Sequence, residues 1–300
     1  MANGKGLLIE AEDFNTIRTK IVNILGTGVG NFGYGQTLQS STVSPGETVT
    51  ASQWNNLRWD IYNTLYHQIG EEPSIVVATE ENVIAYSAGD PNFQYNSRVD
   101  QAADDRFELG VGQFAIETGI SVSESVSFSS IARLTITIDF NTADQARYFF
   151  NSGGKIRFTS TRSGGSSNPQ NTTWTSLLSS VGTQSFDGNS SNLNFYKLTN
   201  SEQSWITQKP SGVYGSNEYR ILVSCNQSNN TTGGATRIIF KIEWIDGYTD
   251  TGALPPPDLV NGTLSLFVDQ IRATGQLQPT GALFSVIGPS SYLSSGFVTT

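Results

Sequence analysis

The chain has 300 residues, only 14 % of them charged, and a formal net charge of −9 at pH 7. Nucleic acid is not expected as a partner, because phosphate binding needs clustered basic residues and the 17 Lys and Arg are scattered. One cysteine excludes an internal disulfide framework, and 30 glycines among many Ser, Thr and Asn favour short strands and tight turns. The composition therefore predicts a mainly β protein.

The N-terminal region contains an internal repeat. Setting Phe14 on Trp54 also superposes Asn15 on Asn55 and Arg18 on Arg58. Each copy carries one apolar stripe at helical spacing, formed by Phe14, Ile17, Ile21 and Leu25 in the first and by Trp54, Leu57, Ile61 and Leu65 in the second. The pattern predicts two helices, over residues 11–26 and 51–70, packed antiparallel as a hairpin around the Gly-rich loop 27–49.

The ends and the contacts of these helices can also be predicted. Thr50 or Ser52 is placed to cap the second helix, and Gly26 and Gly70 would end the helices in the left-handed conformation. We expect the aromatic rings at the matched positions to pack together, and the Asn after each to bond a loop backbone. Because a small helical head buries its stripes poorly, these residues also predict an assembly surface, made by Phe14, Ile17, Ile21, Trp54, Leu57, Trp59 and Ile61.

Residues 73–252 are expected to form a β-rich domain. A strand is predicted at 82–86 and a loop over the polar segment that contains Pro91 and Arg98. From residue 107 the hydrophobic period is two, typical of antiparallel strands with one solvated face. Further strands are predicted at 131–140, 155–162, 193–198, 219–225 and 237–245, and short helices at 142–151 and 173–181.

Residues 253–300 follow a stiff run of three prolines, residues 255–257. A strand is predicted at 262–271, and an extended arm or edge strand at 281–300. The expected organisation is thus a helical head over residues 1–72, the β-rich domain over 73–252 and a C-terminal strand and arm over 253–300. The fold class is α+β, mainly β, with a helical hairpin before an antiparallel β-sandwich-like domain with short helices.

No set of catalytic residues is recognisable. His67 is the single histidine, and no nucleophile motif accompanies it, so a catalytic role is not expected. It lies near the end of the second predicted helix, where its cationic form would interact favourably with the helix dipole. Cys225 lies in an apolar run and is expected in the core. The sequence predicts no enzyme activity, no cofactor and no metal site, with 246–250 as a weaker calcium alternative. Sugar stacking by Trp174, Trp205 or Tyr214 is the other alternative.

Two groups of residues resemble a known class of proteins. The first is Asp13-Phe14-Asn15, Ile24-Leu25-Gly26, Gly33-Tyr34-Gly35-Gln36, Gln53-Trp54-Asn55 and His67-Gln68 with Gly70; the second is the block from Ala146 to Arg157. Both are similar to virion structural proteins of tailed phages that infect cyanobacteria. The resemblance implies a particle component of neck, tail or fibre, made in the host cytoplasm and located in the virion, and it carries no catalytic residues.

The expected function is therefore a non-enzymatic structural subunit that assembles through its N-terminal helices and C-terminal arm. Its expected partners are copies of itself, as a trimer or ring, and other virion proteins. No membrane insertion is expected, because the sequence has no apolar segment of the length that a bilayer requires. The alternative is a lectin-like adhesin that binds glycans of the host surface.

Overall fold

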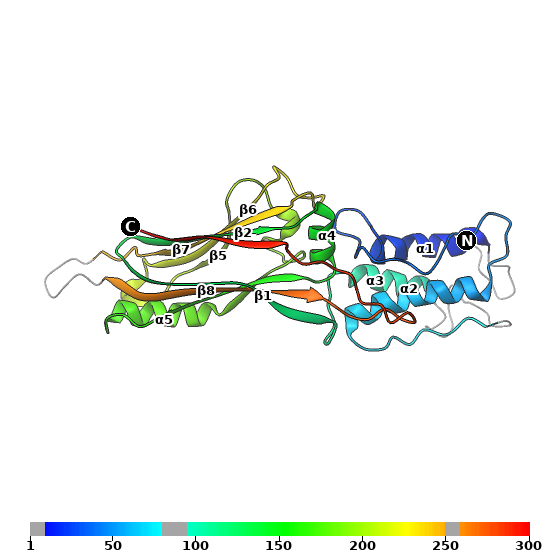
Figure 1. Ribbon diagram of the computed structural model, residues 1–300, viewed down its shortest axis with the longest axis horizontal. Coiled ribbons are helices and arrows are strands. Elements are labelled where there is room, and N and C mark those ends of the chain that lie inside the picture. The colour runs from blue at the N-terminus through cyan, green and yellow to red at the C-terminus, as the bar shows by residue number, and fades with distance from the viewer. Residues whose placement is uncertain (1–9, 80–94, 250–258) are drawn as a thin grey trace. The chain divides into compact units, whose positions relative to one another are not determined.

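The computed structural model describes residues 10–79, 95–249 and 259–300 and divides into two units, each discontinuous in sequence (Figure 1). Unit 1 comprises residues 1–115, 147–154 and 272–287, and unit 2 comprises residues 116–146, 155–271 and 288–300. Both units are compact in their own contacts, and each is described by itself below. The α+β class with two antiparallel sheets is confirmed.

Unit 1 is built around three helices: α1 (Ala11–Leu25), α2 (Ala51–Ile69) and α3 (Tyr95–Asp104). The rings of Phe14 and Trp54 meet edge to face with centroids 5.1 Å apart, as predicted, and Tyr95 packs on the other side of Trp54 at 5.3 Å. The loop expected around Arg98 is wrong, because Tyr95, Val99 and Ala102 give that segment a buried helical face of its own. The strand predicted at 82–86 lies outside the described residues.

The repeated Asn and Arg residues have equivalent roles in the two copies. Asn15 donates to the Val43 carbonyl oxygen at 2.7 Å and accepts from the Val43 amide at 3.0 Å. Asn55 forms the same pair of bonds with Ala78, at 2.8 and 2.9 Å. Three residues later in each helix, Arg18 donates to Ser40 O and Arg58 to Ile75 O. The prediction that each Asn bonds a loop backbone is confirmed, and in each copy the helix holds the chain that follows it.

The antiparallel arrangement of α1 and α2 is wrong. Phe14 and Trp54 pair near the starts of both helices. At the other end, Tyr34 donates its amide to Ile24 O at the end of α1, and its ring lies 5.0 Å from that of His67 near the end of α2. The two helices therefore run in the same direction. Residues 36–50 return to the start of α2 and are held on the way by the bonds to Asn15 and Arg18.

The helix ends agree in part with the sequence. Thr50 caps α2 and forms the reciprocal pair of bonds with Gln53, and Gly70 ends that helix in the left-handed conformation at φ 73°. A Cβ at Gly70 would lie 2.6 Å from the Val111 carbonyl oxygen, so the close approach also requires glycine. The left-handed conformation expected at Gly26 is wrong, since its φ is −80°.

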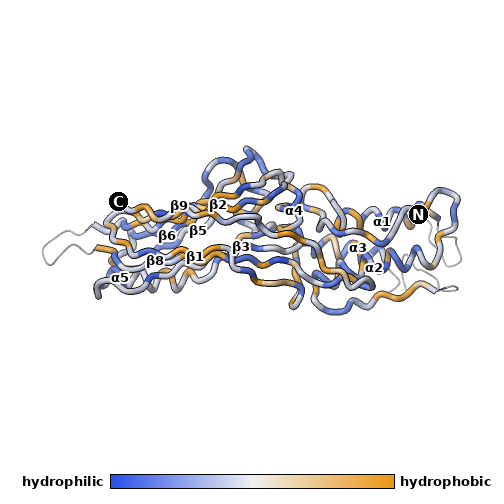
Figure 2. The backbone as a smooth tube through the Cα atoms, in the orientation of Figure 1, coloured by the Kyte–Doolittle hydropathy of each residue, from blue (hydrophilic) through white to orange (hydrophobic). Residues whose placement is uncertain are grey.

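Unit 2 contains two antiparallel sheets. One has the strand order β1-β8-β3-β4 and the other β5-β6-β7-β2-β9. Along β2 buried and partly exposed residues alternate without a break, and hydropathy changes along the strands accordingly (Figure 2). The strands are β1 (Phe114–Phe128), β2 (Ile131–Asp139), β3 (Lys155–Ser163), β4 (Thr183–Phe186), β5 (Gln203–Gln208), β6 (Glu218–Cys225), β7 (Arg237–Ile245), β8 (Val260–Ala273) and β9 (Ser291–Thr299).

Aromatic side chains hold the two sheets together. The Phe158 ring of β3 lies 4.4 Å from that of Phe240 on β7, and Phe186 of β4 lies 5.4 Å from Trp205 on β5. The Tyr219 hydroxyl is buried between the sheets, 2.7 Å from the hydroxyl of Ser160. Large apolar side chains from both inner faces thus form one core, which is the arrangement of a β-sandwich.

The short helices predicted at 142–151 and 173–181 are present, and the first contributes residues to both units, since residues 147–154 belong to unit 1. Helix α4 (Ala143–Asn151) is capped by Thr142, whose hydroxyl accepts from the Gln145 amide. Helix α5 (Pro169–Val181) begins earlier than predicted, because Asn168 caps it and Pro169 occupies its first turn. The strand predicted at 193–198 is wrong: the side chain of Asn194 accepts from the Tyr196 amide and favours a short 3₁₀ turn, Phe195–Lys197.

The C-terminal residues are part of the sandwich. β8 pairs with β3 along its length, and β9 pairs with β2 as an edge strand. Residues 272–287 between them belong to unit 1. The units therefore differ from the contiguous head, β domain and arm expected from the sequence. The reason is that β1 and β2, early in the chain of unit 2, lie in the same sheets as the C-terminal strands β8 and β9. The three prolines at 255–257 lie outside the described residues.

Candidate functional site

The two groups of residues that carry the resemblance meet in unit 1, and we call the part that meets the signature cluster: Tyr34, His67, Gln68, Arg147, Asn151 and Ser152. Arg147 is nearly buried and donates to the carbonyl oxygens of Thr27, Gly30 and Phe32, at 3.0, 3.1 and 3.3 Å. Asn151 donates to the carbonyl oxygens of Gly30 and Gly33. One turn of α4, from Arg147 to Asn151, thus holds the glycine-rich turn that follows α1.

Tyr34 links this turn to the other helices of the unit. Its hydroxyl donates to Arg106 O at 2.7 Å and accepts from the Gln68 side chain at 2.8 Å. Gln68 also donates to Ala102 O in α3. Burial raises the pKa of the Tyr34 phenol far above its ordinary value, with the Gln68 bond a smaller opposing effect. The phenol therefore stays protonated and acts as a structural hydrogen-bond donor.

His67 is buried in the signature cluster and is neutral. Its Nε2 atom lies 3.0 Å from Ser152 O, and its ring stacks on Phe284 with centroids 4.4 Å apart. Burial lowers the pKa of His67 to about 4, and the bond to Ser152 O only partly offsets this. The expectation of a cationic histidine at the helix end is wrong, because the ring is enclosed by aromatic side chains and not exposed to solvent.

Acidification is expected to destabilise the protein through His67. An unfolded histidine has its ordinary pKa of 6.5 and binds a proton before the folded one, whose pKa is about 4. The His67 contribution is therefore complete above pH 6.5 and is lost as pH falls toward 4, by about 3 kcal/mol in total. Denaturant unfolding at pH 7 and pH 4.5 measures this. The difference in unfolding free energy between those pH values should be smaller in His67→Gln, and an equal difference would contradict the assignment.

The seven residues predicted to form an assembly surface are mostly core residues. Phe14, Ile17, Ile21, Trp54, Leu57 and Ile61 are at most 6 % exposed, so they cannot touch another chain without unfolding of unit 1. The sequence argument failed here because α3 and the held segments add cover that a two-helix head lacks. Trp59 alone remains half-buried, with the Arg58 guanidinium 4.5 Å above its ring.

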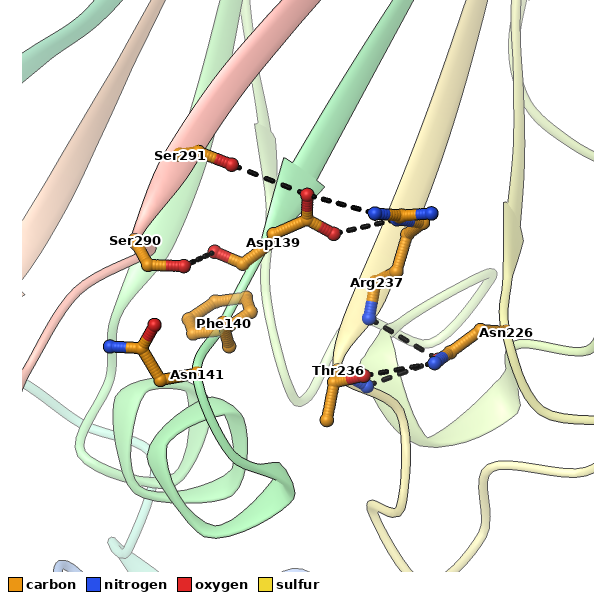
Figure 3. A pocket seen from close by; sticks show the side chains of 8 residues that line it. All are labelled: Asp139, Phe140, Asn141, Asn226, Thr236, Arg237, Ser290 and Ser291. Carbon is orange, nitrogen blue, oxygen red and sulfur yellow. Dashed lines mark hydrogen bonds and ion pairs between the residues drawn. The ribbon is translucent and has the colours of Figure 1, made fainter.

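A shallow pocket of about 520 Å³ lies in unit 2, at the end of β2 (Figure 3). It is lined by Asp139, Phe140, Asn141, Asn226, Thr236, Arg237, Ser290 and Ser291. Figure 3 shows Asp139 between Arg237 and Ser291. The Arg237 Nε atom lies 2.6 Å from a carboxylate oxygen of Asp139. The hydrogen bond from Arg237 holds the pKa of the Asp139 carboxyl below its ordinary range.

The polar groups of this pocket bind one another. Asn226 accepts from the amides of Thr236 and Arg237 and donates to the Thr236 hydroxyl. Ser290 donates to Asp139 O. These bonds join the ends of β2, β6, β7 and β9. The polar groups of the pocket therefore have a structural role, which is to connect neighbouring strands.

The remaining sequence candidates lie within packed structure. Burial raises the pKa of the Cys225 thiol, which lies in the core as expected. Trp174 is 1 % exposed, so its ring offers no sugar platform, whereas Trp205 is partly exposed and packs against Phe158. Asp246 accepts from Gln170 at 2.6 Å and from the Tyr248 amide, and Asp250 lies outside the described residues. Within residues 10–79, 95–249 and 259–300, no group of three or more His, Cys, Asp or Glu is placed to hold a metal ion.

None of the helices in the described part of the chain has both the length and the apolar character of a membrane span. The resemblance block included Arg147 and Asn151 but gave them no structural role, because their partners are backbone carbonyls more than one hundred residues away and leave no local pattern. Comparisons with protein families, with curated proteins and with solved structures give no match for this chain.

Proposed function

We propose that this protein is a non-enzymatic structural subunit of a tailed-phage particle, in the neck, tail or fibre. The observation that carries the proposal is the signature cluster. The residues that resemble virion structural proteins are used to hold backbone: Arg147 and Asn151 bind the turn after α1, and Asn15 and Asn55 bind the segments after their helices. A rigid scaffold needs its chain held in this way.

The surfaces available for assembly differ from those expected. Because the helical stripes are buried, contacts with other copies must use apolar residues that are exposed outside these helices. Leu293 and Val298 on β9 are two of them, each 55 % exposed. These belong to the C-terminal arm, the second surface that the sequence predicted for assembly. An extended edge strand is suited to repeated contacts, since its backbone groups pair with any strand of matching register.

The pocket beside Asp139 is the observation that favours an adhesin as the second candidate. Its lining of Asn, Ser, Thr, Asp and Arg matches the polar groups that bind sugar hydroxyls, although its side chains already bind one another. An array of host-surface glycans, probed with the whole chain, tests this reading. Binding that is lost in Asn141→Ala would favour the adhesin, because Asn141 lines the pocket.

The structural proposal is tested on the particle itself. Mass spectrometry of purified phage particles that encode this chain should find it at a fixed copy number. A cryo-EM map should contain density that fits the sandwich of unit 2 in the neck, tail or fibre. Absence of the chain from purified particles, with its presence in the infected host, would reject a virion role and leave the host as the place where the protein acts.

A further inference from the structure

The two sheets of unit 2 have four edges, and these differ in how well they are protected against pairing with another strand. β4 has only 4 residues. β5 has 6, carries a register shift, and is flanked by Glu202 and by Lys209. β1 contains Glu117 and Glu124. β9 has 9 residues, SYLSSGFVT, with neither charge nor proline. Short length, charge, proline and β-bulges are the usual protections of an edge strand, and β9 has only a register shift, which it shares with β5.

The backbone groups on the open side of β9 can be identified from its pairing with β2. Thr300 and Ile131 exchange two hydrogen bonds, so their backbone groups point toward one another. Alternation along the antiparallel ladder then points the backbone groups of every second residue away from β2. Given the register shift near Ser295, the residues that point outward are those opposite Ala132, Leu134, Ile136 and Ile138, namely Thr299, Phe297, Ser294 and Tyr292.

We propose that β9 pairs with β9 of a second copy of this chain, antiparallel and around a two-fold axis. When Leu293 is set opposite Val298 of the second copy, Tyr292 lies opposite Thr299 and Ser294 lies opposite Phe297. All four outward-pointing residues then form hydrogen-bonded pairs, and the irregular residues Ser295 and Gly296 meet at the axis. The two five-stranded sheets become one continuous sheet of ten strands.

The side chains fit the same register. Leu293 and Val298 lie opposite Thr137 and Arg133 in β2, which places both on the outer face of the sheet, where each is 55 % exposed. In the dimer they form two apolar cross-strand pairs at positions without backbone hydrogen bonds, where opposing side chains approach most closely. The uncharged strand meets its copy without like-charge repulsion, although the whole chain carries a net charge of −9. β1 could not self-pair as well, because of its two carboxylates.

This inference rests on the proposed role as an assembling subunit and names the contact between copies. Light scattering and sedimentation of the whole chain should show a dimer. Leu293→Lys and Val298→Glu each place a charge opposite an apolar residue and should weaken association at least about tenfold. Mixed together, the two variants should dimerise again, because the ammonium group introduced in one chain then lies opposite the carboxylate introduced in the other. Ile116→Lys is the matched control, since Ile116 is 56 % exposed on the edge strand of the other sheet.

Each result decides for or against the β9 contact. Thermal unfolding of the variants establishes that they are folded, which is expected at exposed positions. A parent chain that stays monomeric at the highest soluble concentration would overturn the inference. So would association that Ile116→Lys weakens and Leu293→Lys does not, or a mixture that fails to dimerise when both variants are folded. These outcomes leave the particle experiment untouched, so the contact and the virion role fail separately.

Discussion

Replacing Trp54 by Ala is expected to lower the stability of unit 1 by about 3 to 5 kcal/mol, the usual cost of truncating a buried Trp. Trp54 is 4 % exposed and contacts Phe14 of α1 and Tyr95 of α3, so one substitution removes contacts to both neighbouring helices. A loss of this size is comparable to much of the stability of a small domain. Hydrogen exchange should show reduced protection of α1, α2 and α3, with the sheets of unit 2 protected as before.

Trp59→Ala is the matched control on the same helix. Trp59 is half-buried and packs against Arg58 and Tyr62, so its truncation should cost about 1 kcal/mol. Equal effects of the two substitutions would mean that the matched aromatic pair has no special place in the core. Unchanged protection of α1 in Trp54→Ala would mean that the helices do not depend on a shared core.

Replacing Arg147 by Ala should release the turn after α1. Three carbonyl oxygens, those of Thr27, Gly30 and Phe32, lose the guanidinium donor. The Gly30 oxygen keeps its bond from Asn151, so two buried acceptors are left without a partner, at about 1 to 3 kcal/mol each, and we expect about 4 kcal/mol in total. Denaturant unfolding measures the loss, and hydrogen exchange of residues 27–36 locates it.

Arg147→Lys separates geometry from charge. Lys keeps the positive charge but cannot direct several donors from one plane, so it should recover only a small part of the lost stability. Asp144→Ala, on the first turn of the same helix, controls for a general effect on α4. Full stability of the Lys variant would show that charge alone holds the turn and that the fork geometry is unimportant.

The sequence was most informative where a residue acts through its neighbours along the chain. The repeat predicted the pairing of Phe14 with Trp54 and the backbone bonds of Asn15 and Asn55. It could do so because each copy of the pattern forms a helix that binds the segment following it. Alternating hydropathy predicted β2, β3, β6 and β7 nearly to the residue, since each strand buries one face. The Thr50 cap and the left-handed Gly70 followed from helix-end chemistry.

Only the tertiary structure decided the direction of the helices, the burial of their stripes and the protonation of His67. Helix direction depends on how residues 36–50 return along α1, and the bonds that hold them join residues more than twenty positions apart. The stripes are covered by α3, whose sequence is weakly apolar. The low pKa of His67 and the role of Arg147 both arise from groups brought together by folding. Local pattern therefore determined which elements form, while long-range packing determined which of their residues remain available for function.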